Sequence, residues 1–308
     1  MNVFLAGATG AIGRSLVPML VKEGHKVVAM TRAPKKVRGL EAMGAAPVLG
    51  DVFDVALLND IAKRAAPEVI IHQLTSFGAT ARDPFAETNR LRIEGTRKLV
   101  AAAQAAGAQR FIAQSISFLC TPGGNGLTDE STPLYLDAPE PVKSVVAAVA
   151  ELERQTLSAD EIVGIVLRYG HFYGPGTYYA PGGYVAESVR NGQMPIIGSG
   201  AGTYSFIHID DAAAATVHAL THGAPGIYNI VDDAPAPVSE WLPMYTELLS
   251  APTPERISET AALEAVGPLP VYLMTEQRGA SNAKAKRELG WQLAHGSWRD
   301  GFKALLTN

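Results

Sequence analysis

Three glycines, spaced three residues apart, follow a short apolar run at the start of the chain. The run Val3–Ala6 leads into Gly7, Gly10 and Gly13, and helix-favouring sequence begins near Ala11. In strand–turn–helix units the first glycine allows the tight turn, the second lets backbone approach a pyrophosphate, and the third lets the helix pack on the strand. The helix N-terminus offers free N–H groups to phosphates. An ordinary turn is the alternative, but the flanking strand and helix favour a dinucleotide site. We expect its contacts to be Gly7, Thr9, Gly10, Ala11, Ile12 and Gly13.

Apolar segments with strand character alternate with helical segments through the first 170 residues. Further strands are predicted at residues 25–31, 46–49, 69–72, 110–117 and 164–169, and helices at 12–23, 57–66, 87–106 and 142–159. This alternation predicts a parallel sheet covered on both faces, with right-handed crossovers between strands. We therefore predict an α/β fold, a Rossmann-type doubly wound parallel sheet with a ligand crevice at the carboxyl ends of its strands.

The composition of the sequence changes after Tyr173, where glycine- and proline-rich segments separate short predicted elements. Such segments are typical of loops. Residues 1–170, with 203–230 returning to them, are predicted to form the dinucleotide-binding domain. Residues 171–202 and 231–308 are predicted to form a smaller C-terminal substrate lobe over the crevice.

Composition narrows the classes of partner. The formal net charge is −4 and charged residues make up 18%, which gives no reason to expect nucleic acid or an anionic membrane as a partner. No apolar run approaches the roughly 18 residues that span a bilayer, and a strand starting at residue 2 leaves no room for a signal peptide. The single cysteine, Cys120, excludes an intramolecular disulfide, and we expect no metal site. These features predict a cytoplasmic protein with a small-molecule ligand.

Seven segments carry motifs in a fixed order along the chain: residues 6–13, 50–52, 70–74, 94–96, 166–176, 206–211 and 281–291. In this order they resemble the extended short-chain dehydrogenase/reductase family, the group of nucleoside-diphosphate-sugar epimerases and dehydratases. The resemblance covers essentially the whole chain. It implies that Asp51 contacts the adenine and that Val52, Leu74 and Thr75 also line the coenzyme site.

The end of the second strand bears on the choice of coenzyme. NAD-specific sheets place an Asp or Glu there to bind the ribose 2′-hydroxyl. This chain instead has Thr31 and Arg32, with Lys35 and Lys36 just beyond. Because an arginine fork suits a 2′-phosphate, we predict NADP(H), with NAD possible; a solvated basic loop is the alternative.

The chain departs from the family at the catalytic helix. The resemblance implies a Tyr acid/base, a Lys four residues later, and commonly a Glu four residues after that. No Tyr-x-x-x-Lys occurs in the 308 residues. When Glu151 is aligned with the family's Glu, Lys143 takes the Tyr position and Ala147 the Lys position.

Three further positions differ from the family. Ile116 falls in the slot of the Ser or Thr that bonds the reacting oxygen, flanked by Ser115 and Ser117. His171 replaces an Asn that binds diphosphate, and Ser205 replaces a frequent Arg. These differences weaken the case for a nucleotide-sugar substrate, because charge-assisted donors to a diphosphate are missing.

Four residues are candidates for catalysis. His171 is expected at the mouth of the crevice with a pKa near neutrality, which suits a proton donor; a structural histidine is the alternative. Lys143 is expected to donate a proton or bind an anion, or else to be simply exposed. Ser115 and Ser117 are the candidates for bonding the reacting oxygen.

Three functions remain open at this point. The first is an NADP(H)-dependent oxidoreductase that acts on a small carbonyl or enone without a nucleotide diphosphate, using a non-standard proton donor. The second is an epimerase or dehydratase with an altered site. The third is a non-catalytic NADP(H)-binding sensor. The helices predicted at 87–106 and 142–159 resemble the pair that forms dimer interfaces in family members, so we also expect a homodimer.

Overall fold

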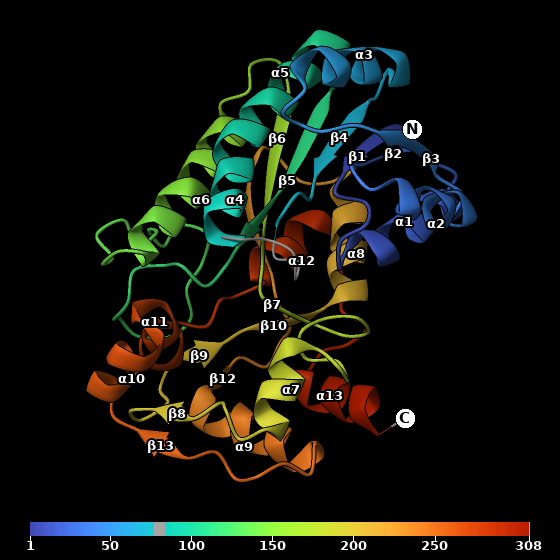
Figure 1. The fold of residues 1–308 in the computed structure, drawn as a ribbon. Coiled ribbons are helices and arrows are strands. Elements are labelled where there is room, and N and C mark those ends of the chain that lie inside the picture. Colours follow the sequence, from blue (N-terminus) through green and yellow to red (C-terminus); the bar gives the residue numbers. More distant parts are fainter. Residues whose placement is uncertain (77–83, 308) are drawn as a thin grey trace.

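The computed structural model describes residues 1–76 and 84–307 and is built on one seven-stranded parallel sheet. The strand order is β11-β6-β5-β4-β1-β2-β3 (Figure 1). This confirms the predicted Rossmann-type fold. The strand bounds are β1 Asn2–Ala6, β2 Lys26–Thr31, β3 Ala46–Leu49, β4 Val69–His72, β5 Arg110–Ile116, β6 Val163–Tyr169 and β11 Gly226–Ile230.

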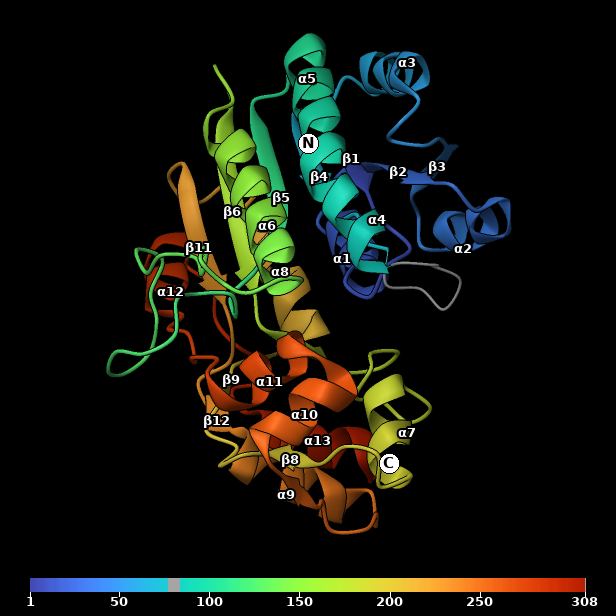
Figure 2. The same cartoon turned by 60° about the vertical axis from the view of Figure 1, so that its left-hand side comes forward.

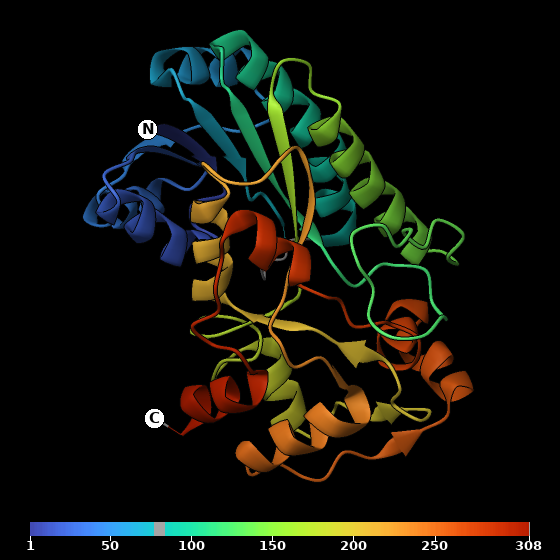
Figure 3. The ribbon, with the colours of Figure 1, turned by 180° about the vertical axis from the view of Figure 1, so that it is seen from behind.

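Helices cover both faces of the sheet because each face presents alternate, fully buried apolar residues. One face packs against α1 (Gly13–Lys22), α2 (Val37–Ala42), α8 (Ile209–His218) and α12 (Ala283–Leu289). The view from behind shows α8 and α12 in front of the strands (Figure 3). The other face packs against α3 (Val55–Ala65), α5 (Thr96–Ala106) and α6 (Val142–Leu157).

The order of the strands reverses between β1 and β4. From β1 the chain runs outward through β2 and β3, then returns to the other side of β1 and continues through β4, β5 and β6. Ala6 accordingly lies beside Met30 on one side and His72 on the other. In open α/β sheets such a reversal opens the crevice in which ligands bind.

The single helix predicted over 87–106 is interrupted in the structure. It is replaced by α4 (Pro84–Arg90), a π-helical turn, η2 (Leu91–Gly95), and then α5, which ends as expected at Gly107 with φ of +71°. The apolar periodicity does not reveal such a turn, because it changes the hydrogen-bonding pattern by only one residue. π-helical turns are frequent at functional sites.

A second lobe lies beyond the carboxyl ends of the strands (Figures 1 and 2). Its core is aromatic, with Tyr173, Tyr179, Phe206, Trp241 and Phe302 packed together. Its helices are α7 (Tyr184–Arg190), α9 (Val238–Leu248), α10 (Glu259–Val266), α11 (Pro268–Thr275) and α13 (Trp298–Leu306). Its short strands are β7 (His171–Tyr173), β8 (Ile196–Ile197), β9 (Thr203–Tyr204), β10 (Phe206–His208), β12 (Ala236–Pro237) and β13 (Arg256–Ile257).

Among the described residues, no helix combines the length and apolarity needed to cross a membrane.

Candidate coenzyme site and active site

The glycine turn after β1 forms a cradle that side chains would fill. Gly7 has φ of +100°, and a Cβ there would lie 2.4 Å from the carbonyl oxygen of Gln73. A Cβ on Gly13 would lie 2.2 Å from the carbonyl oxygen of Ala8. Gly10 is exposed, and α1 starts with neither a side-chain cap nor an acidic residue in its first turn. These open N–H groups and close backbone contacts fit a coenzyme pyrophosphate.

The ends of β2 and β3 supply the residues expected at the adenosine half. Arg32 Nη1 lies 3.7 Å from Asp51 Oδ2, and both side chains are well exposed. The Thr31 hydroxyl accepts a hydrogen bond from the Ala33 N–H (3.2 Å), and Val52 is buried. This edge therefore offers one carboxylate, which can bind a ribose hydroxyl, and one guanidinium, which can bind a phosphate.

The end of β4 is held by a neutral histidine. The Leu74 N–H donates to His72 Nδ1 (3.2 Å), so Nε2 carries the proton and donates to the Thr96 hydroxyl (3.1 Å). Burial, together with the charge of the nearby Arg92, lowers the pKa of His72 to about 4. Leu74 and the exposed Thr75 are both expected to line the coenzyme site. The hydrogen bonds of His72 connect the backbone at Leu74 with Thr96, the first residue of α5.

Helix α6 carries two glutamates on opposite faces. Glu151 lies on the outer face, where Arg154 and Gln155 hydrogen-bond it and lower its pKa to about 2. Lys143 and Ala147 are exposed on the same side. Glu153, in contrast, is 5% exposed and faces the sheet. Side chains two residues apart on a helix point about 200° away from each other. The sequence alignment on Glu151 therefore places the family's Tyr and Lys positions, Lys143 and Ala147, on the outer face.

The inner face of α6 is apolar on the side of Glu153 that leads toward the start of the helix. Counting back four and eight residues from Glu153 leads to Val149 and Val145, which are both buried. They belong to an apolar cluster with Ile116 and Phe118, which follow the end of β5. Neither side chain on this face can transfer a proton. An alignment on Glu153 would place these two valines, in place of Lys143 and Ala147, at the positions of the family's Tyr and Lys.

The two serine candidates are buried, and the Ser115 hydroxyl is engaged within the protein. Ser115 donates to Glu153 Oε1 (2.7 Å), and Arg168 binds the same carboxylate through two hydrogen bonds of 2.7 and 2.6 Å. Ser117 is 2% exposed, and its N–H donates to the Tyr169 carbonyl (3.0 Å). Ser115 thus serves a buried ion pair between α6 and β6.

His171 is held between two aromatic rings at the start of the second lobe. The rings of Phe118 and Tyr204 stack on it with centroid distances of 4.1 and 4.0 Å. Its Nε2 lies 3.1 Å from Gln277 Oε1, and Gln277 Nε2 donates to the Thr203 carbonyl (2.9 Å). Burial lowers the pKa of His171 to about 4. The expectation of a pKa near neutrality is therefore wrong, because both ring faces are covered.

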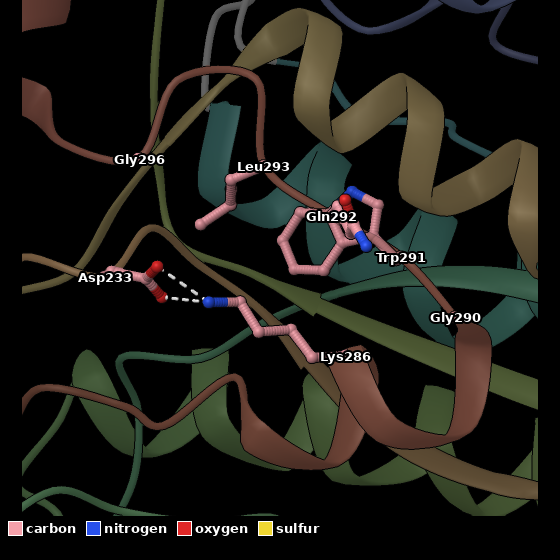
Figure 4. A pocket seen from close by; sticks show the side chains of 7 residues that line it. All are labelled: Asp233, Lys286, Gly290, Trp291, Gln292, Leu293 and Gly296. Atoms are coloured by element: carbon pink, nitrogen blue, oxygen red, sulfur yellow. Dashed lines mark hydrogen bonds and ion pairs between the residues drawn. The ribbon is translucent and has the colours of Figure 1, made fainter.

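A separate pocket lies on the α12 side of the molecule, between that helix and the loop through Trp291 (Figure 4). Lys286 points at Asp233, and its Nζ donates to both carboxylate oxygens at 2.6 and 2.7 Å. The Asn282 amide donates to the same carboxylate (2.8 Å). Because these charges satisfy one another, the pocket is explained by packing between the C-terminal segment and β11.

Comparison with known proteins agrees with this geometry. The model of the NAD-dependent epimerase/dehydratase family matches residues 3–231. A 3-diazoavenalumate denitrifying reductase of a Streptomyces species is 45% identical over 306 residues, covering 98% of this chain and 99% of that protein. A 2-alkyl-3-oxoalkanoate reductase of Stenotrophomonas maltophilia is 27% identical and covers 86% and 79%.

Solved structures share the fold. UDP-glucose 4-epimerase of Thermotoga maritima, with UDP-glucose, superposes with a TM-score of 0.79 at 22% identity, covering 100% of this chain and 98% of that one. Human epimerase family protein SDR39U1, with NADPH, gives 0.76 at 20% identity and covers both chains fully. The chain belongs to the NAD-dependent epimerase/dehydratase family, within the extended short-chain dehydrogenase/reductases, and has their NAD(P)-binding Rossmann fold.

Proposed function

We propose that this protein is an NADPH-dependent reductase that replaces the diazo group of a small aromatic substrate with hydrogen and releases N2. The observation that carries the proposal is the apolar inner face of α6, where Val145 and Val149 stand in place of an acid and its lysine. The similarity to the denitrifying reductase, at 45% identity along nearly the whole chain, supplies the substrate class.

The chemistry of this reaction matches a site without an acid. A bound nicotinamide coenzyme supplies hydride. Replacement of N2 in an arenediazonium by hydride breaks one C–N bond, forms one C–H bond and transfers two electrons, and it consumes no proton. Reduction of a carbonyl needs a proton at oxygen as well. The apolar cluster of Val145, Val149 and Ile116 therefore suits the first reaction, since it offers no proton donor and keeps water away.

NADPH is the proposed coenzyme because of the basic edge beyond β2. Arg32, Lys35 and Lys36 are all exposed there, and one carboxylate, Asp51, lies 3.7 Å from Arg32. The 2′-phosphate of NADPH would supply the negative charge that these cations need for balance.

The test follows NADPH oxidation by the purified protein on 3-diazoavenalumate carrying labelled diazo nitrogen. We expect one labelled N2, detected by mass spectrometry, for each NADPH consumed, and an arene with hydrogen at the vacated carbon. Omission of the protein is the control for spontaneous loss of N2. Coenzyme oxidation with both nitrogens retained in the product, or no oxidation, would refute the proposal.

Reduction of a small carbonyl or enone is the second candidate. The relatives at 26% and 27% identity, named as a ketoreductase and an oxoalkanoate reductase, favour it. This reaction would need a proton from water, because His171 is neutral near pH 7 and Lys143 lies on the outer face of α6. A panel of ketones, quinones and enones tests it. Tight NADPH binding without turnover on either panel would instead support a sensor, and recycling of bound coenzyme on a sugar nucleotide would support an epimerase.

We also propose a homodimer formed through η2 and α6. Ile93 and Leu157, on these two adjacent elements, are 40% and 39% exposed, and a second copy of the chain would cover them. Sedimentation at micromolar concentration tests the proposal. A monomer in the native protein, or a dimer unaffected by Ile93→Asp together with Leu157→Asp, would contradict it.

A further inference from the structure

Arg92 is a buried cation with no counter-ion among the residues that the structure describes. It lies on the π-helical turn η2 and is 5% exposed, and it makes no hydrogen bond or ion pair with any residue in the ranges 1–76 and 84–307. Burial lowers its pKa to about 10, so it stays charged near neutrality. A buried, unpaired guanidinium is costly unless an anion reaches it.

The carboxylates on the surrounding elements are already engaged. Glu153, on the inner face of α6, is bound by Arg168 and Ser115. Glu94 on the same turn lies 3.4 Å from Arg90, and Glu87 on α4 accepts from the Ser76 hydroxyl (2.5 Å). The glutamates of α4, η2 and α6 are thus all engaged by other described residues. This charge distribution suits an anion supplied from outside the chain.

The fold puts this cation at the reacting half of the crevice. Arg92 is close enough to His72, the last residue of β4, to lower its pKa, and η2 packs beside α6 (Figure 2). The coenzyme in such sheets lies across the reversal, here between β1 and β4. Its adenosine half is expected at β2 and β3, where Arg32 and Asp51 lie. The β4 and α6 side is therefore left for the nicotinamide and the substrate.

We propose that Arg92 binds the carboxylate of an aromatic acid substrate and thereby orients its ring against the apolar face of α6. The planar guanidinium donates two parallel hydrogen bonds to a carboxylate, which a lysine cannot reproduce. The substrate class rests on the function proposed above; the anion-binding role rests on Arg92 itself. An aromatic acid fits both features of the site, because its charge meets Arg92 while its ring meets the partly exposed Ile116 and Phe118, which pack on the cluster of Val145 and Val149.

The experiment titrates 4-hydroxycinnamate and its methyl ester into protein saturated with NADP⁺. For the native protein we expect the acid to bind at least about tenfold more tightly than the ester. Arg92→Met should bring the two affinities within about twofold by weakening only the acid, and Arg92→Lys should restore part of the preference. The matched control is Arg90→Met, two residues earlier, where an exposed arginine lies over the Phe53 ring.

The measured acid-to-ester ratios decide whether Arg92 binds the substrate carboxylate. An equal preference in native protein and Arg92→Met, or no preference in the native protein, would overturn the proposal. An equal loss of NADPH affinity in Arg92→Met would assign Arg92 to the coenzyme instead. Thermal unfolding checks the fold of each variant, and if Arg92→Met unfolds, Arg92→Lys still reports the acid-to-ester ratio. If that ratio behaves as expected but no N2 is released from 3-diazoavenalumate, the proposed reaction fails while the role of Arg92 stands.

Discussion

Removal of Glu153 should destabilise the protein strongly, because it would leave a charged arginine buried without its partner. Arg168 is 3% exposed and Glu153 is 5% exposed, and two hydrogen bonds of 2.7 and 2.6 Å join them. Ser115 donates a third bond to the same carboxylate. In Glu153→Ala all three donors lose their acceptor within the core. The expected change is a large loss of folding free energy with the coenzyme cradle left in place.

The size of the effect follows from this burial. Breaking a buried ion pair by removing one partner costs about 3–5 kcal/mol. Unfolding entropy of about 2.1 cal/mol/K per residue gives roughly 0.65 kcal/mol/K for 308 residues, so Tm should fall by about 5–8 °C. In the double variant Glu153→Met with Arg168→Met, apolar side chains replace the pair, and most of the lost stability should return.

Calorimetric unfolding of the two variants and the native protein measures these shifts. The matched control is Glu151→Ala on the same helix, where the partner Arg154 is exposed; it should leave Tm almost unchanged. A fall of less than about 2 °C in Glu153→Ala, or a double variant no more stable than Glu153→Ala, would refute the reasoning. Either result would mean that solvent reaches Arg168 and compensates its charge.

Three other changes have defined outcomes. In Gly13→Ala the new Cβ would lie 2.2 Å from the Ala8 carbonyl, so α1 must move away from the strand; calorimetry should show NADPH binding weakened at least about tenfold. Arg32→Ala should weaken NADPH by about 10- to 100-fold, the value of a charge-assisted bond, and NADH by less than about twofold; equal losses would contradict a 2′-phosphate contact. His171 and His72 have pKa values lowered to about 4 from 6.5, so the unfolded state binds about one more proton at each between these values and stability falls as pH falls. In His171→Phe the dependence of unfolding free energy on pH near pH 5 should drop by about 1.4 kcal/mol per pH unit, measured by urea unfolding; an unchanged slope would mean that His171 is solvated.

The fold could be predicted because its signals are local. The turn at Gly7, the close contact at Gly13 and the run of buried strands each depend on a few neighbouring residues. Strand–helix alternation then leaves few topologies, since crossovers are right-handed. The π-helical turn at Leu91–Gly95 could not be predicted in this way, because the sequence there keeps an ordinary helical pattern.

The site was harder to predict because its properties depend on contacts between distant residues. Glu151 and Glu153 are equivalent in the sequence, and only packing against Arg168 shows which one faces the sheet. The pKa of His171 is set largely by Phe118 and Tyr204, which come from separate segments. The position of a histidine after a strand predicts a place near the crevice. Its protonation depends on how deeply it is buried, which the sequence alone does not show.

These features together restrict the reactions that the site can support. Arg92 keeps its protons near neutrality and so stabilises negative charge without transferring a proton, while His72 is neutral and already uses both ring nitrogens. The inner face of α6 is apolar at Val145 and Val149. An alkoxide formed in such a site would have to take its proton from water, which an apolar face excludes. A leaving group that departs as neutral N2 needs no such proton, so the features that disfavour carbonyl reduction are compatible with the proposed loss of a diazo group.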